Sequence, residues 1–411
     1  MAASGNDPGH WSRSLWIPVL AGGLVMGLAL GVRHVQGLFL LPVTMDRGWS
    51  RETFAFAMAV QNLVWGLAQP FTGMIADRYG SPRVIAGGLM CYALGLVCMV
   101  LAQTSLAFVL GAGLCIGIAL SGTAFAVIYG ALSRIVPIGR RGWALGLAGA
   151  IGGLGQFAMV PAAQALIGGW AWTGALAIFA VIMALLLPLA LPMRDQVAGR
   201  AAAGAEQSMK AAVAEAFRHR GFWLLNLGFV ACGFQLAFIG THLPAYLMDR
   251  GLQPADAVAA LAIIALTNVA GTYLFGLWGG SLRRKYLLAG VYLARTAVMA
   301  LFVLLPLSAW SVYLFAAAMG FLWLGTVPLT NGLIAQVFGV RYLTTLFGFV
   351  FLGHQIGSFL GVWLGGYVFV ATGSYQAIWL IAIVLGLFAA VLHWPIDDRA
   401  VVRDGLRPAT P

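Results

Sequence analysis

Long apolar runs separated by short polar segments dominate the chain from about residue 16 to residue 394. A helix needs about 20 mostly apolar residues to cross roughly 30 Å of hydrocarbon, and these runs have that length. The pattern therefore predicts twelve membrane-spanning helices. Their expected ranges are 16–43, 54–76, 83–103, 106–132, 143–166, 170–192, 222–247, 256–279, 286–306, 309–334, 344–371 and 375–394.

One polar segment is much longer than the other connections. It covers 194–220, is rich in alanine and basic residues, and carries a short amphipathic pattern over 209–217. We expect it to be a cytoplasmic linker between an N-terminal six-helix bundle over 1–193 and a C-terminal six-helix bundle with a cytoplasmic tail over 221–411.

An internal repeat supports this division. The segment LPVTMDRG at 41–48 recurs as LPAYLMDRG at 243–251, each time at the end of the first expected helix of its half. Parallel repeats of this kind imply a pseudo-two-fold axis along the membrane normal and a site near the midplane between the halves. Such an arrangement is typical of carriers, whose halves rock around a shared site.

Composition excludes a soluble enzyme. Hydrophobic side chains make up 61% of the 411 residues and charged ones only 9%, and the mean hydropathy is +0.93. The four cysteines (Cys91, Cys98, Cys115 and Cys232) lie in apolar runs without metal-ligand spacing, so we interpret them as packing residues. The sequence has no nucleotide-binding loop and no catalytic constellation, so we expect no enzyme activity, no cofactor and no metal.

The net charge of +11 reflects topology rather than nucleic-acid binding. With the N-terminus in the cytoplasm, 18 of the 23 Lys and Arg residues fall in inside segments and three in outside segments, while Arg33 and Arg295 fall within spans. This asymmetry predicts that both termini are cytoplasmic. Compact loops and tails favour a bacterial inner membrane.

Polar residues within the spans are few, and none of those lying deep in a span is acidic. A polar group in hydrocarbon is costly, so we expect it to face a central site or another helix. The candidate substrate-binding residues are Arg33, His34, Gln61, Asn62, Gln156, Gln235, Asn268, Arg295, Asn331, His354 and Gln355. Aromatic residues that either line the same site or simply pack are Trp65, Phe234, Phe238, Tyr273 and Trp323.

Arg33 is the strongest candidate among them. A guanidinium stays charged and needs a counter-charge once it is desolvated, and no buried carboxylate is available to supply one. The missing partner is then an anionic substrate. The alternative is an arginine capped by the carbonyls of a broken helix. For Arg295, pairing with Asn268 or with backbone is as good an interpretation as substrate contact.

His34 and His354 are the candidate proton-coupling residues, because imidazole titrates near neutral pH. A protonated His354 would add positive charge to an anion site, and the neutral form would release the anion. The alternative is a neutral histidine satisfied by Gln355 or by a neighbouring helix. His34 follows Arg33 directly but points about 100° away around the helix.

The turn after the second span carries a motif: Gly73, Asp77, Arg78, Gly80 and Arg83. Asp77 can sit against a helix N-terminus or nearby basic residues when the cytoplasmic side is closed, so we interpret the motif as a gate. It resembles the loop signature of the major facilitator superfamily. The resemblance implies an all-α membrane fold of twelve helices in two pseudo-symmetric six-helix bundles, with the first helix of each half lining the central site.

Within that superfamily, GLFLLP at 37–42 followed by GWSR at 48–51 is similar to the monocarboxylate and oxalate/formate transporter branch. Related carriers place an Asp and, four residues later, an Arg in the eighth span. The corresponding positions here are Asn268 and Thr272, so the acid–base pair of that branch is absent.

We therefore expect a monomeric secondary transporter in the lipid bilayer that moves a small organic anion, a monocarboxylate, by alternating access. Coupling would be to protons or to exchange of a counter-anion. The alternative is an efflux carrier for an amphiphilic drug or metabolite.

Overall fold

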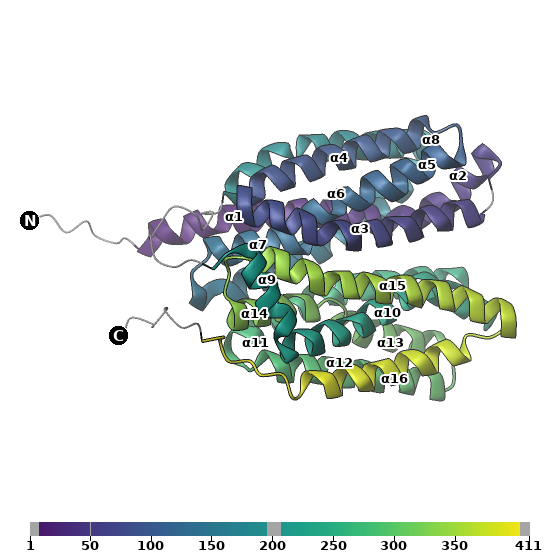
Figure 1. Ribbon diagram of the computed structural model, residues 1–411. Coiled ribbons are helices and arrows are strands. Elements are labelled where there is room, and N and C mark those ends of the chain that lie inside the picture. The colour runs from purple at the N-terminus through teal and green to yellow at the C-terminus, as the bar shows by residue number, and fades with distance from the viewer. Residues whose placement is uncertain (1–7, 50, 195–206, 403–411) are drawn as a thin grey trace, which may run out of the picture.

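The computed structural model describes residues 8–49, 51–194 and 207–402. All regular secondary structure in these ranges is helical (Figure 1). Most of the first half of the predicted linker, 195–206, and the end of the predicted tail, 403–411, lie outside the described residues.

The N-terminal half is built from long helices, several of them interrupted. A 3₁₀ turn interrupts the first span and a π-helical turn the fourth. α8 changes direction at Trp170 and Ala171, whose backbone angles are not helical, so it contains two spans. The elements are α1 (Pro8–His34), η1 (Val35–Phe39), α2 (Leu40–Arg47), α3 (Arg51–Tyr79), α4 (Ser81–Leu101), α5 (Ser105–Val109), η2 (Leu110–Cys115), α6 (Ile116–Thr123), α7 (Phe125–Ile135), η3 (Ile138–Arg140), α8 (Arg141–Leu185) and η4 (Leu187–Met193).

The C-terminal half follows a short helix, α9, that coincides with the amphipathic pattern at 209–217. Its tenth span is divided into α13 and α14. The elements are α9 (Met209–Arg218), α10 (Arg220–Asp249), α11 (Pro254–Ser281), α12 (Arg284–Leu304), α13 (Ala309–Phe321), α14 (Thr326–Phe338), α15 (Leu343–Thr372) and α16 (Gln376–His393).

Ten helical segments of the described chain are long and apolar enough to cross a membrane. One of them, 138–193, contains both spans of α8, and the more polar α3 is a further long helix. Each of the twelve predicted spans is therefore represented, and the all-α membrane fold is confirmed.

The structure divides three helices that the sequence pattern predicts as continuous, 16–43, 106–132 and 309–334, and proline explains the breaks in the first and the last of them. Pro42 lacks the N–H that would bond to the carbonyl of Leu38, and the 3₁₀ turn lies there. Pro328 likewise has no N–H for the carbonyl of Leu324, in the gap between α13 and α14, and this carbonyl instead accepts a hydrogen bond from the N–H of Val327 at 3.0 Å. Both breaks interrupt the regular hydrogen bonding of the helix.

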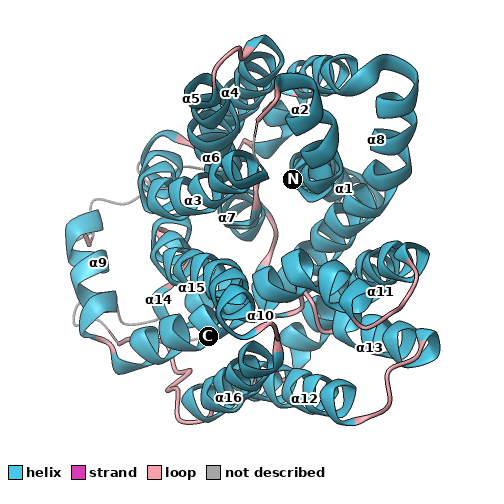
Figure 2. Cartoon of the chain, turned by 90° about the vertical axis from the view of Figure 1, so that its right-hand side faces the viewer, coloured by secondary structure: helices cyan, strands magenta, loops and turns pink. Residues whose placement is uncertain are grey.

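The two halves lie side by side and meet along two helix pairs, α3 with α15 and α8 with α11 (Figures 1 and 2). We call the end at which α3 finishes and α15 begins the base, and the opposite end the top. Both described chain ends lie at the base (Figure 1).

Glycines allow the halves to approach closely near the base. A Cβ added to Gly276 of α11 would lie 2.4 Å from the Cα atom of Gly146 on α8, and one added to Gly73 of α3 would lie 2.7 Å from the carbonyl oxygen of Thr344. In the described part of the chain, the hydrogen bonds between the halves lie at the base and at mid-height. The two halves are thus in contact at the base, which is closed.

Candidate functional site

Arg33 is the penultimate residue of α1, just before the 3₁₀ turn. Its Nη2 donates a hydrogen bond to Asn62 Oδ1, and its Cζ atom lies 5.1 Å from the ring centroid of Trp65. Its Nε atom is buried without a hydrogen-bond partner. Among the described residues no carboxylate pairs with Arg33. Within the described part of the chain, the contacts of this charge are therefore one amide and one aromatic ring.

Residues of α15 complete the surroundings of Arg33 from the other half. The rings of Trp65 and Phe351 are 4.8 Å apart, and Gln355 Nε2 donates to the backbone oxygen of Asn62 over 3.4 Å. We call Arg33, Asn62, Trp65, Phe351 and Gln355 the central cluster. It lies near the middle of both α3 and α15, and Arg33 and Asn62 keep part of their surface exposed. The cluster is thus an accessible polar point at mid-height between the halves.

His354 adjoins this cluster without touching Arg33. Its ring stacks on Phe351 at 5.2 Å and 7°, and its Nδ1 atom lies 3.1 Å from Gln355 Oε1. The Ser358 hydroxyl lies 3.4 Å from the same nitrogen. His34 is half-buried, and no hydrogen bond connects it to another described residue. The two candidate proton-coupling residues therefore differ: His354 belongs to a polar group on α15, and His34 does not.

Arg295 and Asn268 form hydrogen bonds with the backbone at the break between α13 and α14. Arg295 is fully buried and donates from Nε and Nη2 to the carbonyl oxygen of Leu322, at 3.0 and 2.6 Å, and from Nη2 to that of Trp323. Asn268 Oδ1 accepts a hydrogen bond from the backbone N–H of Leu324 at 3.0 Å. Both side chains satisfy backbone groups that the break exposes. The contacts of Arg295 are thus with backbone, which is one of the two interpretations offered from the sequence.

Three further candidates lie apart from the central cluster. Gln61 donates to the carbonyl oxygen of Ala112 in the π-helical turn at 2.7 Å, and Gln235 donates to that of Ala382 on α16 at 2.9 Å. Gln156 is half-buried on α8 without a hydrogen bond to another described residue. The structure thus groups Arg33, Asn62, Gln355 and the neighbouring His354, and separates the rest from them.

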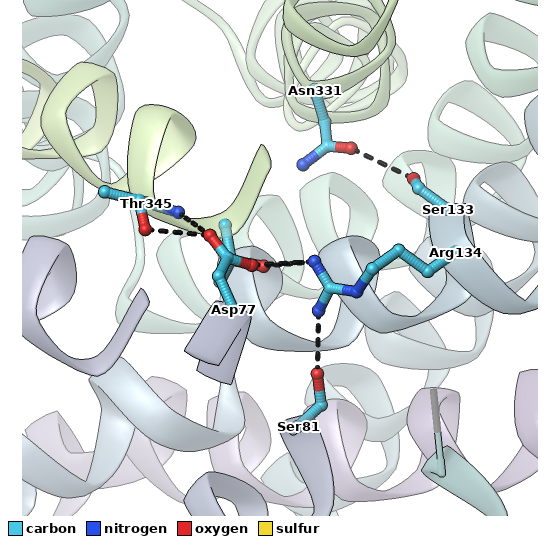
Figure 3. A network of polar contacts seen from close by, with 7 residues as sticks. Asp77, Ser81, Ser133, Arg134, Asn331 and Thr345 are labelled. Atoms are coloured by element: carbon cyan, nitrogen blue, oxygen red, sulfur yellow. Dashed lines mark hydrogen bonds and ion pairs between the residues drawn. The ribbon is translucent and has the colours of Figure 1, made fainter. Parts of the chain in front are cut away.

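Asp77 holds the halves together at the base (Figure 3). Its Oδ2 atom accepts hydrogen bonds from the backbone N–H and the hydroxyl of Thr345, at 2.7 and 2.8 Å, in the first turn of α15. Its Oδ1 atom lies 2.7 Å from Nη1 of Arg134, which donates from Nη2 to Ser81 Oγ at 3.0 Å. The carboxylate therefore sits at a helix N-terminus, where backbone N–H groups favour negative charge.

Asn331, the remaining substrate-binding candidate, belongs to the base rather than to the centre. Its Oδ1 atom accepts a hydrogen bond from Ser133 Oγ at 3.4 Å, across the boundary between the halves (Figure 3). Arg134 also reaches across, from Nη1 to the hydroxyl of Thr344 at 3.2 Å. We call Asp77, Arg134, Thr344 and Thr345 the base latch.

The rest of the gate motif shapes the turn around this latch. Gly80 has a φ of 95°, which disfavours side chains, and it precedes α4. Arg78 and Arg83 are exposed: Arg78 lies over the Tyr79 ring, and Arg83 donates to the carbonyl oxygen of Tyr79 at 3.3 Å. Asp77 is therefore paired with an arginine outside the motif.

Sequence reasoning missed four participants: Arg134, Thr344, Thr345 and Phe351. From the sequence, Arg134 was only a positive charge between spans, and Thr344, Thr345 and Phe351 were ordinary residues of an apolar helix. Each acts through a partner far away in the chain. The internal repeat is the one signal that could have directed attention to the start of α15, by indicating that the two halves face each other.

Comparisons with known proteins agree with this geometry. Residues 19–345 match the Major Facilitator Superfamily. Monocarboxylate transporter 11 of Homo sapiens is 30% identical over 399 residues, covering 92% of this chain and 81% of that protein. The transporter YhjX of Escherichia coli is 23% identical over 364 residues, covering 85% of this chain and 87% of YhjX.

The fold has a counterpart among solved structures. FucP, the fucose:proton symporter of E. coli, was solved in the outward conformation; it gives a TM-score of 0.73 at 16% identity and covers 93% of this chain and 99% of its own. This likeness supports the fold, and the sequence relatives support the family. The chain therefore belongs to the Major Facilitator Superfamily of membrane transporters, not to an enzyme family, and is related to the monocarboxylate transporters.

Proposed function

We propose that this transporter carries a small organic anion, a monocarboxylate, across the inner membrane by alternating access. The observation that carries the proposal is the partly exposed guanidinium of Arg33, which lies at mid-height between the halves without an anionic partner. An arginine stays charged, and its planar fork matches a carboxylate with two parallel hydrogen bonds. A substrate carboxylate would supply the missing counter-charge.

Asn62 and Trp65 are suited to hold this arginine ready. The amide oxygen fixes one arm of the fork, and the indole ring covers one face of the guanidinium, which leaves its remaining donors for a ligand. The apolar Trp65–Phe351 pair next to it would pack against the hydrocarbon part of a monocarboxylate. Relatives that are named monocarboxylate transporters, at 27–30% identity, favour the same substrate class.

The closed base supports alternating access between two bundles, 1–193 and 221–411, joined by the linker. Because the positive residues gather at the end where the chain termini lie, we assign the base to the cytoplasm. The described state then gives the substrate access from the outside. Release to the cytoplasm would require the base latch to open while the top closes. A monomer contains all of these parts.

For coupling, we propose His354 as the residue that takes up the proton. Its partners are Gln355, Ser358 and the thiol of Cys232, to which Arg295 also donates a hydrogen bond, and its ring reaches the central cluster through Phe351. A positive charge there would strengthen the attraction of the central cluster for an anion. His34 is the second candidate, and exchange of a counter-anion is the mechanism if neither histidine couples.

Uptake into proteoliposomes tests the proposal. The substrates are labelled monocarboxylates and dicarboxylates, with and without an inward proton gradient, and the variants are Arg33→Gln, His354→Gln and His34→Gln. Arg47→Gln is a matched control, because Arg47 also covers a tryptophan ring, that of Trp172 at 5.3 Å, but lies beside Asp46 and away from the central cluster.

We expect monocarboxylate uptake in the wild type and in Arg47→Gln, and its loss in Arg33→Gln. His354→Gln should keep uptake but lose its stimulation by the gradient. Uptake in Arg33→Gln equal to that of the wild type would refute the anion site. Absence of carboxylate uptake in the wild type would favour the efflux of amphiphilic compounds instead.

A further inference from the structure

A cavity of about 500 Å³ opens at the base of the N-terminal half, between the end of α3, the start of α4 and the turn η4. α4 lies on the side of this half that is turned away from the C-terminal half (Figures 1 and 2). The cavity is therefore remote from the central cluster and from the contact between the halves. Its lining includes Arg83 and Arg194 together with the apolar side chains of Pro82, Leu187 and Leu191.

The lining combines two positive charges with an apolar wall and has no acidic residue. Arg83 and Arg194 are both exposed, and neither forms an ion pair with a described carboxylate. Asp77, which precedes Arg83 in the same turn, is buried and already bound by Arg134 and Thr345. Asp195, which directly follows Arg194, lies outside the described residues. The two guanidinium groups thus have donors available for an anion in the cavity.

The depth of the cavity points to a lipid rather than to a soluble anion. Arg83 stands at the start of one span and Arg194 directly after the end of another, which is the level of the lipid headgroups. Above Arg83, an exposed stripe continues along α4 at helical spacing through Gly87, Met90 and Leu94. This stripe faces the hydrocarbon.

Gly87 leaves this stripe without a side chain at its lower end. A Cβ added to Gly87 would meet no atom within 4 Å, so the surface one turn above Arg83 is open. An acyl chain can lie against that open surface while its phosphate reaches the arginines. We propose that this cavity binds an anionic phospholipid, with the phosphate held by Arg83 and Arg194 and one acyl chain along Gly87.

Purified protein, stripped of lipid in detergent, is titrated with phosphatidylglycerol and with phosphatidylcholine of the same acyl chains, and bound lipid is counted by native mass spectrometry. Soluble glycerol phosphate is titrated separately. The test variants are Arg83→Gln/Arg194→Gln and Gly87→Leu. The matched control, Arg140→Gln/Arg399→Gln, removes two other exposed arginines at the base.

We expect the wild type and the control to prefer phosphatidylglycerol, and the double variant to lose about 30-fold of that preference, since each basic residue near a membrane surface contributes roughly a factor of five to six. Gly87→Leu should weaken binding of both lipids without changing net charge. An unchanged preference in the double variant, an equal loss in the control, or binding of glycerol phosphate as tight as that of the lipid would overturn the proposal.

Discussion

The base latch predicts how the two conformations of the carrier are balanced. Replacing Asp77 by alanine removes two hydrogen bonds that cross between the halves, from the N–H and the hydroxyl of Thr345 at 2.7 and 2.8 Å. A hydrogen bond to a charged group contributes about 1.5–3 kcal/mol. The closed base should therefore lose at least about 3 kcal/mol relative to the open base, a shift of more than roughly 100-fold in their ratio.

A graded variant separates this effect from misfolding. Thr345→Val removes the hydroxyl but keeps the backbone N–H bond, so it should shift the ratio by about half as much in free energy, on the order of tenfold. Asp398→Ala is the matched control. Asp398 is also a mostly buried carboxylate at the base, but it pairs with Arg283 within its own half.

Spin labels at Arg140 and Arg399, one exposed position at the base of each half, report the separation of the halves by double electron–electron resonance. We expect a longer distance to become populated in the order Asp77→Ala, Thr345→Val, wild type. Identical distance distributions in these three proteins would refute the reasoning. A shift of the same size in Asp398→Ala would show that loss of any basal carboxylate suffices.

Three more predictions concern packing, burial and pH. Gly276→Ala places a Cβ 2.4 Å from the backbone of α8, so it should open the base in the same distance measurement. A Cβ at Gly280 would meet no atom within 4 Å, so Gly280→Ala should leave the base closed, and equal behaviour of the two variants would count against the close packing. Arg295→Met leaves two carbonyls between α13 and α14 without donors. The free energy of unfolding should fall by about 2 kcal/mol or more, and the midpoint of thermal unfolding should fall with it. An unchanged midpoint would contradict the role of Arg295 in binding these carbonyls. The hydrogen bonds from Arg283 hold the pKa of Asp398 below its usual value, so this pair stabilises the fold above about pH 4 and loses its effect as the pH falls through the lowered pKa. The difference in midpoint between wild type and Asp398→Asn should therefore be present at pH 7 and vanish at low pH, and a difference that grows on acidification would refute the assignment.

The spans and the gate motif could be predicted from sequence because they depend on local composition. A run of apolar residues crosses the bilayer whatever its neighbours are. A position with a positive φ, such as Gly80, requires glycine and is therefore visible in a short sequence motif. The partners of Asp77 could not be predicted in the same way. Arg134 and Thr345 come from helices remote in the chain, and only the packing of the two halves brings them together.

Intramembrane polar residues show what prediction from the sequence alone does not resolve. From the sequence, Arg33 and Arg295 are the same kind of residue: an arginine deep in a span without a buried carboxylate. The structure distinguishes them, because the gap before Pro328 gives Arg295 two carbonyls to bind, whereas Arg33 meets one amide and one ring. Which helix breaks, and which side chain reaches the break, depends on tertiary packing that spacing alone does not reveal.

The central claim is that Arg33 recognises the carboxylate of the substrate. Isothermal titration of purified protein with a monocarboxylate and with its neutral amide, for the wild type and for Arg33→Gln, tests this claim without requiring transport. We expect the wild type to bind the carboxylate at least about 100-fold more tightly than the amide, because a buried charge-assisted pair is lost with the amide. The Arg33→Gln variant should bind both ligands equally weakly. A carboxylate preference that survives in Arg33→Gln would contradict the account.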